Sequence, residues 1–174
     1  MRYWTIIMAA AAAASAMPAG ATTGPQTVSP DRNAAGKALV LVPLTLTKID
    51  DLDFGTIIPS ATSGFVTINA TSGARSFGGG VSGAASAAGH RAYFGGAGTP
   101  SQQVIITIDA PTELTSAAGD TISVLALTLD GSARKTIDPT TRAYFFGVGG
   151  VLSIEANQPE GVYSATFTVN ANYL

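Results

Sequence analysis

The most regular alternation of apolar and polar positions lies in the last fourteen residues, Gly161 to Leu174. One set consists of apolar side chains and the other is mainly polar: Tyr163, Ala165, Phe167, Val169, Ala171 and Tyr173 alternate with Val162, Ser164, Thr166, Thr168, Asn170 and Asn172. A period of two places one set on a buried face and the other toward water. The pattern predicts a strand at the extreme C-terminus that is paired with another strand.

Further strands are predicted along the chain. Ala38 to Thr47 is apolar on both faces in its first half, and Pro43 predicts an edge, a bulge or a break in its middle. Gly64 to Ala70 is a short strand in which Val66 and Ile68 form the better core pair. The clearest alternation upstream of the C-terminus spans Gln102 to Asp109 and Thr121 to Leu129.

Turn residues separate these segments. Asp130-Gly131 and Gly149-Gly150 predict two hairpins. Residues 71–98 are rich in glycine, alanine and serine and predict a long flexible excursion, interrupted by a short strand from Arg91 to Phe94. With about seven or eight strands and no helical period, the chain is expected to form an immunoglobulin-like antiparallel β-sandwich, with a closed barrel as the alternative.

The N-terminus has the pattern of a secretory signal peptide over residues 1–21: a positive start, an apolar run and a small-residue tail. Cleavage is expected after Ala21, with Ala14-Ser15-Ala16 as a second option and a retained anchor as the competing interpretation. A flexible leader over 22–37 and one domain over 38–174 then follow. The protein is therefore expected in the periplasm, at the cell surface or outside the cell.

The composition of the chain supports a folded protein and excludes several classes of function. Apolar residues make up 46% of the chain, which is enough for a hydrophobic core, whereas charged residues make up only 11%. A net charge of −2 provides no basic surface for nucleic acid. Because the chain contains no cysteine, disulfides and thiol chemistry are excluded and stability has to come from sheet packing.

The C-terminal segment resembles the last strand of chaperone-usher pilus subunits, which has a glycine fourteen residues from its end, alternating apolar residues and a penultimate tyrosine. Gly161 and Tyr173 occupy those two places. Three segments also look like a family of secreted bacterial proteins classified only as a domain of unknown function, family 4402. These segments are LDFGTI at 52–57, FGVGGVLSI at 146–154 and GVYSATFTVNANY at 161–173.

The pilin resemblance implies an incomplete sandwich whose missing strand is supplied by a periplasmic chaperone and then by an identical or related subunit. The residues expected in the assembly strand are Gly161, Tyr163, Phe167, Val169 and Tyr173, of which Phe167, Val169 and Tyr173 would border the groove. The candidates for a donor or edge strand are Val40, Val42, Leu44 and Leu46. The alternative is a sandwich that is complete within one chain.

Candidate chemistry is sparse. Asp50, Asp51 and Asp53 form the only acidic cluster and could bind calcium, although a solvated turn favours the same residues. Gly78, Gly80 and Gly83 match a dinucleotide-binding spacing without the strand and helix that it requires. We expect no cofactor and no catalysis. The predicted function is a structural surface protein, or else a secreted binding module that holds carbohydrate on aromatic residues among Tyr93, Phe94, Tyr144, Phe145 and Phe146.

Overall fold

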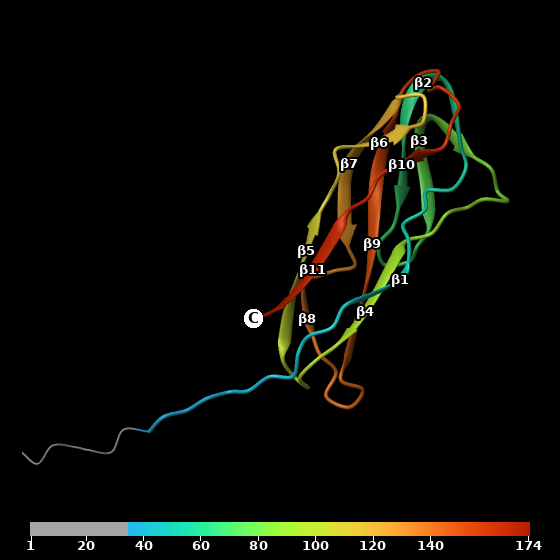
Figure 1. Ribbon diagram of the computed structural model, residues 1–174. Helices are drawn as coiled ribbons and strands as arrows, with labels where there is room; N and C mark the ends of the chain where they lie inside the picture. Colours follow the sequence, from blue (N-terminus) through green and yellow to red (C-terminus); the bar gives the residue numbers. More distant parts are fainter. Residues whose placement is uncertain (1–34) are drawn as a thin grey trace, which may run out of the picture. The chain divides into compact units, whose positions relative to one another are not determined.

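The computed structural model describes residues 35–174, and the chain divides into two units between Ala38 and Leu39. The predicted signal peptide and most of the leader lie outside the described residues. The second unit contains eleven strands and no helix within the described part (Figure 1). In chain order they are β1 Thr47–Asp50, β2 Ile57–Ile68, β3 Arg75–Gly83, β4 Ala92–Ala97, β5 Gln103–Asp109, β6 Glu113–Ser116, β7 Thr121–Leu129, β8 Arg134–Thr136, β9 Ala143–Ile154, β10 Tyr163–Ser164 and β11 Thr168–Tyr173.

The larger sheet is organised around β9. The first half of β9 pairs with β4 and the second half with β2, while β7 runs along its other edge. The hairpin predicted at Gly149-Gly150 is therefore wrong, because both glycines lie inside one continuous strand. Glycine allows β9 and the end of β2 to lie close together here, because a Cβ atom at Gly149 would collide with the backbone of Ile68 and Ala70.

The smaller sheet has the order β11-β5-β8 and packs face to face on the larger one. Its Val104 and Ile106 join Phe94, Phe146 and Val148 of the larger sheet in a shared core. All pairings within the described strands are antiparallel, so the predicted all-β antiparallel sandwich is confirmed, with more strands than expected. The Asp130-Gly131 turn joins β7 to β8, which lie in different sheets, so it connects the two layers instead of forming a hairpin.

A second hydrophobic cluster occupies the other end of the larger sheet. Its buried residues are Val66, Val81, Ile122, Leu152 and Ile154. Val66 and Ile68 both face inward and are almost fully buried, as predicted. Partly buried side chains cover this cluster from the neighbouring segments: Phe54, Ile57, Phe77, Leu114, Val124 and Tyr163.

The flexible excursion predicted over residues 71–98 contains the strand β3, which was not expected, and β4, which overlaps the short strand predicted from Arg91 to Phe94. Glycine does not make β3 a loop here, since its glycines lie against a neighbouring strand. The Phe65 ring of β2 lies over Gly78, its cross-strand partner, and a Cβ atom at Gly78 would collide with that ring. An aromatic ring thus replaces the side-chain packing that glycine lacks.

The strand predicted from Ala38 to Thr47 is also corrected, because the first strand begins at Thr47 and residues 38–46 belong to no strand. Thr45 still follows the β1–β4 register, since its N–H donates to the carbonyl of Ala97 (2.9 Å). Pro43 has no N–H to donate, so a regular ladder is interrupted before Thr45. The break that Pro43 predicted is present, and the apolar residues before it belong to no strand.

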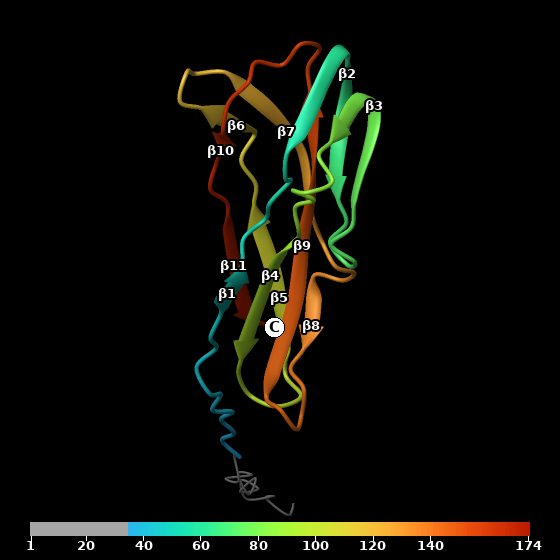
Figure 2. The ribbon, with the colours of Figure 1, turned by 90° about the vertical axis from the view of Figure 1, so that its right-hand side faces the viewer.

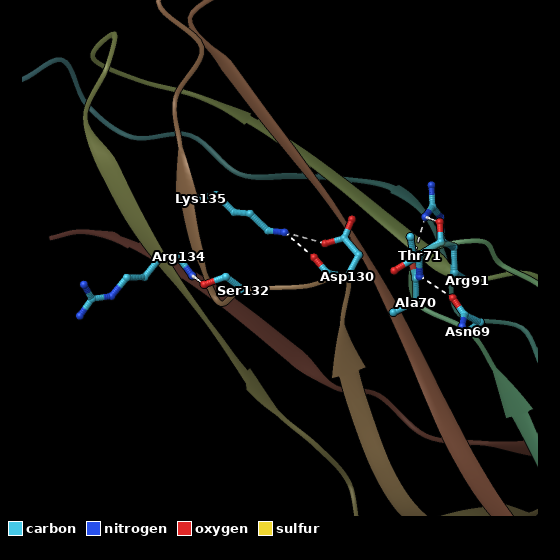
Figure 3. Close-up of polar contacts among 8 residues, drawn as sticks. All are labelled: Asn69, Ala70, Thr71, Arg91, Asp130, Ser132, Arg134 and Lys135. Atoms are coloured by element: carbon cyan, nitrogen blue, oxygen red, sulfur yellow. Dashed lines mark hydrogen bonds and ion pairs between the residues drawn. The ribbon is translucent and has the colours of Figure 1, made fainter.

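Polar side chains fix several turns (Figure 3). Lys135 donates to both the backbone carbonyl (2.6 Å) and the carboxylate (2.8 Å) of Asp130 across the turn between β7 and β8. Arg91 donates to the carbonyls of Ala70 (2.9 Å) and Thr71, so it ties the end of β2 to the start of β4. These contacts are structural and account for three of the few charged groups, Lys135, Asp130 and Arg91.

Candidate functional site

An open groove of about 560 Å³ lies over the second hydrophobic cluster. Its floor is the inner face of β7 and β9, where Ile122, Val124, Leu127, Leu152 and Ile154 face the opening. Its two walls are residues 52–59, before and within the start of β2, and residues 158–167, which include β10. Ile122, Leu152 and Ile154 are almost fully buried beneath the groove, whereas Val124 and Leu127 are half-buried, so the apolar surface that remains open is that of Val124, Leu127 and the walls.

The first wall is held in place by Arg75 of β3. Its guanidinium donates to the carbonyls of Phe54 (3.0 Å), Thr56 (3.1 Å) and Ala84 (2.8 Å). Gly55 has a φ of 70°, and a Cβ atom there would collide with Ala87 and with the Arg75 guanidinium. Because three carbonyls converge on one cation, the wall is a fixed surface although it contains no strand before Ile57.

The second wall contains the C-terminal segment, which is divided into two strands. β10 pairs with β6 in the larger sheet and β11 pairs with β5 in the smaller sheet, while residues 165–167 belong to no strand. The chain therefore crosses from one layer to the other beside the groove. Tyr163 and Phe167 line the groove, and Val169 and Tyr173 pack against the shared core, whereas Ala165 is exposed.

A polar network fixes the end of this wall. The Gln158 amide donates to the Thr121 carbonyl (2.9 Å) and to the Tyr163 hydroxyl (3.0 Å), and that hydroxyl donates to the Pro159 carbonyl (2.7 Å). Each of these groups therefore already has a partner within the wall. The groove consequently offers apolar surface more than unpaired polar groups, which suits an apolar segment better than a polar metabolite.

Two edge strands flank the same side of the sandwich. β1 ends the order of the larger sheet and β11 ends that of the smaller sheet. Figure 2 shows both on the same side, while Figure 1 shows them in different layers. Edge strands present N–H and C=O groups on their outer side, so this side can pair with an additional strand.

Gly161 lines the groove, but the fold does not require a glycine there. Its φ is not positive, and a Cβ atom would meet only ordinary contacts, the Ser116 Cβ atom at 3.5 Å and the Tyr163 ring at 3.7 Å. We expect Gly161→Ala to change the free energy of unfolding by less than about 0.5 kcal/mol, measured by urea denaturation. Gly64→Ala is the contrasting variant, because its Cβ would collide with the Gly78 carbonyl. Equal destabilisation by both substitutions would contradict this account.

The three aspartates of the acidic cluster make separate contacts. The Asp51 carboxylate pairs with Lys48 (2.6 Å), the Asp53 carboxylate accepts from the Gly55 N–H (2.7 Å), and Asp50 is exposed at a register shift in β1. Within residues 35–174 no three histidine, cysteine or carboxylate side chains are grouped so that they could hold a metal ion. The aspartates instead shape the turn into the first wall.

The dinucleotide spacing is also explained structurally. Gly78, Gly80 and Gly83 lie along the antiparallel strand β3, and no helix follows within the described residues. A phosphate cradle needs the N-terminus of a helix after the glycines, so the match is incidental.

The five aromatic residues considered for sugar binding are divided between the two faces of the larger sheet. Phe94, Tyr144 and Phe146 are buried in the shared core. Tyr93 and Phe145 lie on the outer face as parallel rings, with centroids 6.0 Å apart and planes 7° from one another. Carbohydrate binding, if it occurs, would therefore use only this outer pair, and it stays a prediction.

Tyr144 links the core to the segment before β1, since its hydroxyl donates to the Thr45 carbonyl (2.8 Å). Burial raises the pKa of Tyr144, with a smaller contribution from the nearby Tyr173. The folded chain therefore favours the protonated phenol, a contribution that is fully present below the unfolded pKa of about 10 and is lost as the pH rises through the folded value. We expect the stability of the wild type to fall more above pH 10 than that of Tyr144→Phe, in urea denaturation at a series of pH values. Superimposable pH profiles would refute this.

Comparison with known families gives one match. Residues 44–173 match the family described as "Domain of unknown function (DUF4402)". The chain belongs to this family. The DUF4402 match covers nearly all of the unit that contains the strands, including both walls of the groove. No curated protein and no solved structure matches the chain significantly, so the likeness to chaperone-usher pilins stays a prediction. Among the described residues, no helix is long and apolar enough to span a membrane.

Sequence reasoning located one wall of the groove and missed the other. Of the three residues expected to border a groove, Phe167 lines it, whereas Val169 and Tyr173 belong to the separate strand β11 and pack against the shared core. The wall at residues 52–59 depends on Arg75, which lies about twenty residues downstream in a segment that was expected to be flexible. An isolated arginine in a glycine-rich stretch with almost no other charge was the available signal.

Proposed function

We propose that this DUF4402 protein is an exported, non-catalytic structural subunit that assembles by β-strand complementation at the groove between residues 52–59 and 158–167. The observation that supports it is the open groove, whose floor consists of residues that belong to the hydrophobic core. Val124 and Leu127 of this floor are half-buried, so a monomer keeps part of their apolar surface in water, and covering it would release free energy.

A strand is the occupant that fits this site best. An inserted strand can form main-chain hydrogen bonds with residues 165–167 of the second wall, which belong to no strand, while its alternate side chains cover the groove floor. The groove lacks a nucleophile beside a general base, and its tyrosine and glutamine already form hydrogen bonds within the wall. Catalysis is therefore not part of the proposal.

The chain also provides a suitable donor. Leu39 and Val40 are 75% and 88% exposed, although both are large apolar residues. They precede the first strand and so lie upstream of the folded sandwich. Large apolar side chains that a monomer leaves exposed are expected to be buried against a partner, and the groove of another subunit offers apolar surface for them. A periplasmic chaperone would cover the same groove before assembly.

The test is to compare assembly of the exported chain with that of a donor variant. Leu39→Asn combined with Val40→Asn removes apolar surface that the monomer leaves in water, so monomer stability should be unchanged. Burial of one such side chain is worth about 1.5–3 kcal/mol, so the loss of two should make the association at least about hundredfold weaker. Light scattering and size-exclusion chromatography would measure this association.

Leu125→Asn is the matched control, because Leu125 is 62% exposed on β7 and does not line the groove. It should associate like the wild type. A wild-type chain that folds without a chaperone and stays monomeric at high concentration would contradict the proposal. In that case, specific retention on immobilised glycans that is lost in Tyr93→Ala and Phe145→Ala would favour the alternative function, a self-complete carbohydrate-binding module.

A further inference from the structure

The segment from Val42 to Leu46, here called the anchored segment, is attached to both sheets by its backbone. At its first residue, the Val42 N–H donates to the Thr99 hydroxyl (2.8 Å) and the Val42 carbonyl accepts from the Tyr173 hydroxyl (2.8 Å). The Tyr173 hydroxyl in turn accepts from the Thr99 N–H (2.7 Å). The penultimate residue of the chain thus fixes the start of the anchored segment.

A second tyrosine fixes its middle from the opposite sheet. Tyr144 of β9 donates to the Thr45 carbonyl (2.8 Å), and the Thr45 N–H donates to the Ala97 carbonyl of β4 (2.9 Å). The Thr45 hydroxyl also accepts from the Ala97 N–H (2.9 Å). Two tyrosines from different layers of the sandwich therefore bind the same short stretch of backbone.

Side-chain packing also changes near the start of the anchored segment. Leu44 and Leu46 pack against the shared core, whereas Leu39 and Val40 are exposed. The glycines of the β4 end allow the close contact: a Cβ atom at Gly98 would collide with Leu44 and with the Tyr173 hydroxyl, and one at Gly96 with Thr45 and Tyr144. The match to the family also begins at residue 44.

We infer that the anchored segment stays in its own subunit during assembly, so that the donated strand consists only of residues before Val42. This inference rests on the proposed function. Tyr173 then holds the start of the anchored segment in its own subunit, and the donor ends just before that point. Leu44 and Leu46 are therefore no longer candidate donor residues. Leu39, Val40 and Leu41, with the residues before them, are the part of the chain that a second copy can take up.

The test uses the absence of cysteine in the natural chain. Thr45 and Ala97 are exposed and lie opposite one another in the continued β1–β4 register, so Thr45→Cys with Ala97→Cys places two thiols at a distance that a disulfide can span. Oxidation of the monomer then locks the anchored segment to its own β4. The reduced form of the same variant is the folding control.

We expect the oxidised and reduced forms to assemble to the same extent, with Leu44 to Leu46 equally protected from hydrogen exchange in monomer and assembly. Assembly of the reduced form combined with loss of assembly in the oxidised form would overturn the inference and leave the proposed function intact. Failure of both forms and of the wild type to assemble would overturn the proposed function and this inference together.

Discussion

Replacing Phe146 with alanine is expected to lower the free energy of unfolding by about 3–5 kcal/mol, a large share of the roughly 5–15 kcal/mol that stabilises a typical domain. Phe146 lies in the middle of β9 and is fully buried. Its ring is stacked on Phe94 (5.3 Å between centroids) and lies parallel to Tyr144 (6.3 Å). The alanine variant leaves a cavity between the two sheets, because β9 cannot shift while it is paired on both edges.

The neighbouring residue is a matched control for this prediction. Phe145 points to the outer face of the same strand and is 53% exposed. Phe145→Ala removes the same number of atoms from a half-solvated position, so we expect a cost of about 1 kcal/mol or less. Urea denaturation of both variants gives the comparison. Similar losses of unfolding free energy for the two variants would contradict the assignment of Phe146 to a buried face of β9 and Phe145 to a solvated face.

Replacing Arg75 with alanine is expected to cost about 2–3 kcal/mol, because the carbonyls of Phe54, Thr56 and Ala84 lose a charged donor. The Arg75 guanidinium also lies over the Phe77 ring at 4.8 Å, so packing is lost together with hydrogen bonds. The largest effect should be on the first wall of the groove. Residues 53–57 should exchange amide hydrogens faster. The groove should also bind a second subunit more weakly, even under conditions where the chain is folded.

Arg134→Ala is the control for this prediction, because Arg134 is exposed and, within the described residues, its hydrogen bond to Ser132 comes from the backbone N–H. It should change stability by less than about 0.5 kcal/mol. If Arg75→Ala left hydrogen exchange at residues 53–57 unchanged, the wall would be held by something other than the guanidinium.

The sequence was sufficient to predict the sandwich, because its strands alternate with a period that only a half-buried strand satisfies. The strands β5 and β7 and the inward orientation of Val66 and Ile68 were predicted for this reason. Tyr173 was recognised from its position, but its bonds to Val42 and Thr99 were not, since hydrogen bonds across more than seventy residues leave no local pattern.

The errors have a common physical origin in glycine. Local propensity assigns glycine to turns, and this misplaced β3 and divided β9 at Gly149-Gly150. In the folded chain these glycines allow strands and rings to approach closely, as Phe65 does over Gly78. The groove was not predictable in detail, because one of its walls depends on a distant arginine.

The most direct test of strand complementation is an intermolecular cross-link between donor and groove. Leu39→Cys and Ala165→Cys would be prepared as separate chains, mixed in equal amounts, assembled and oxidised; Ala165 is exposed on the second wall and Leu39 on the proposed donor. Our account predicts a disulfide-linked dimer that contains one chain of each variant, and none when Leu125→Cys replaces Ala165→Cys. Equal cross-linking to Leu125→Cys, or no cross-linked dimer in assembled material, would contradict it.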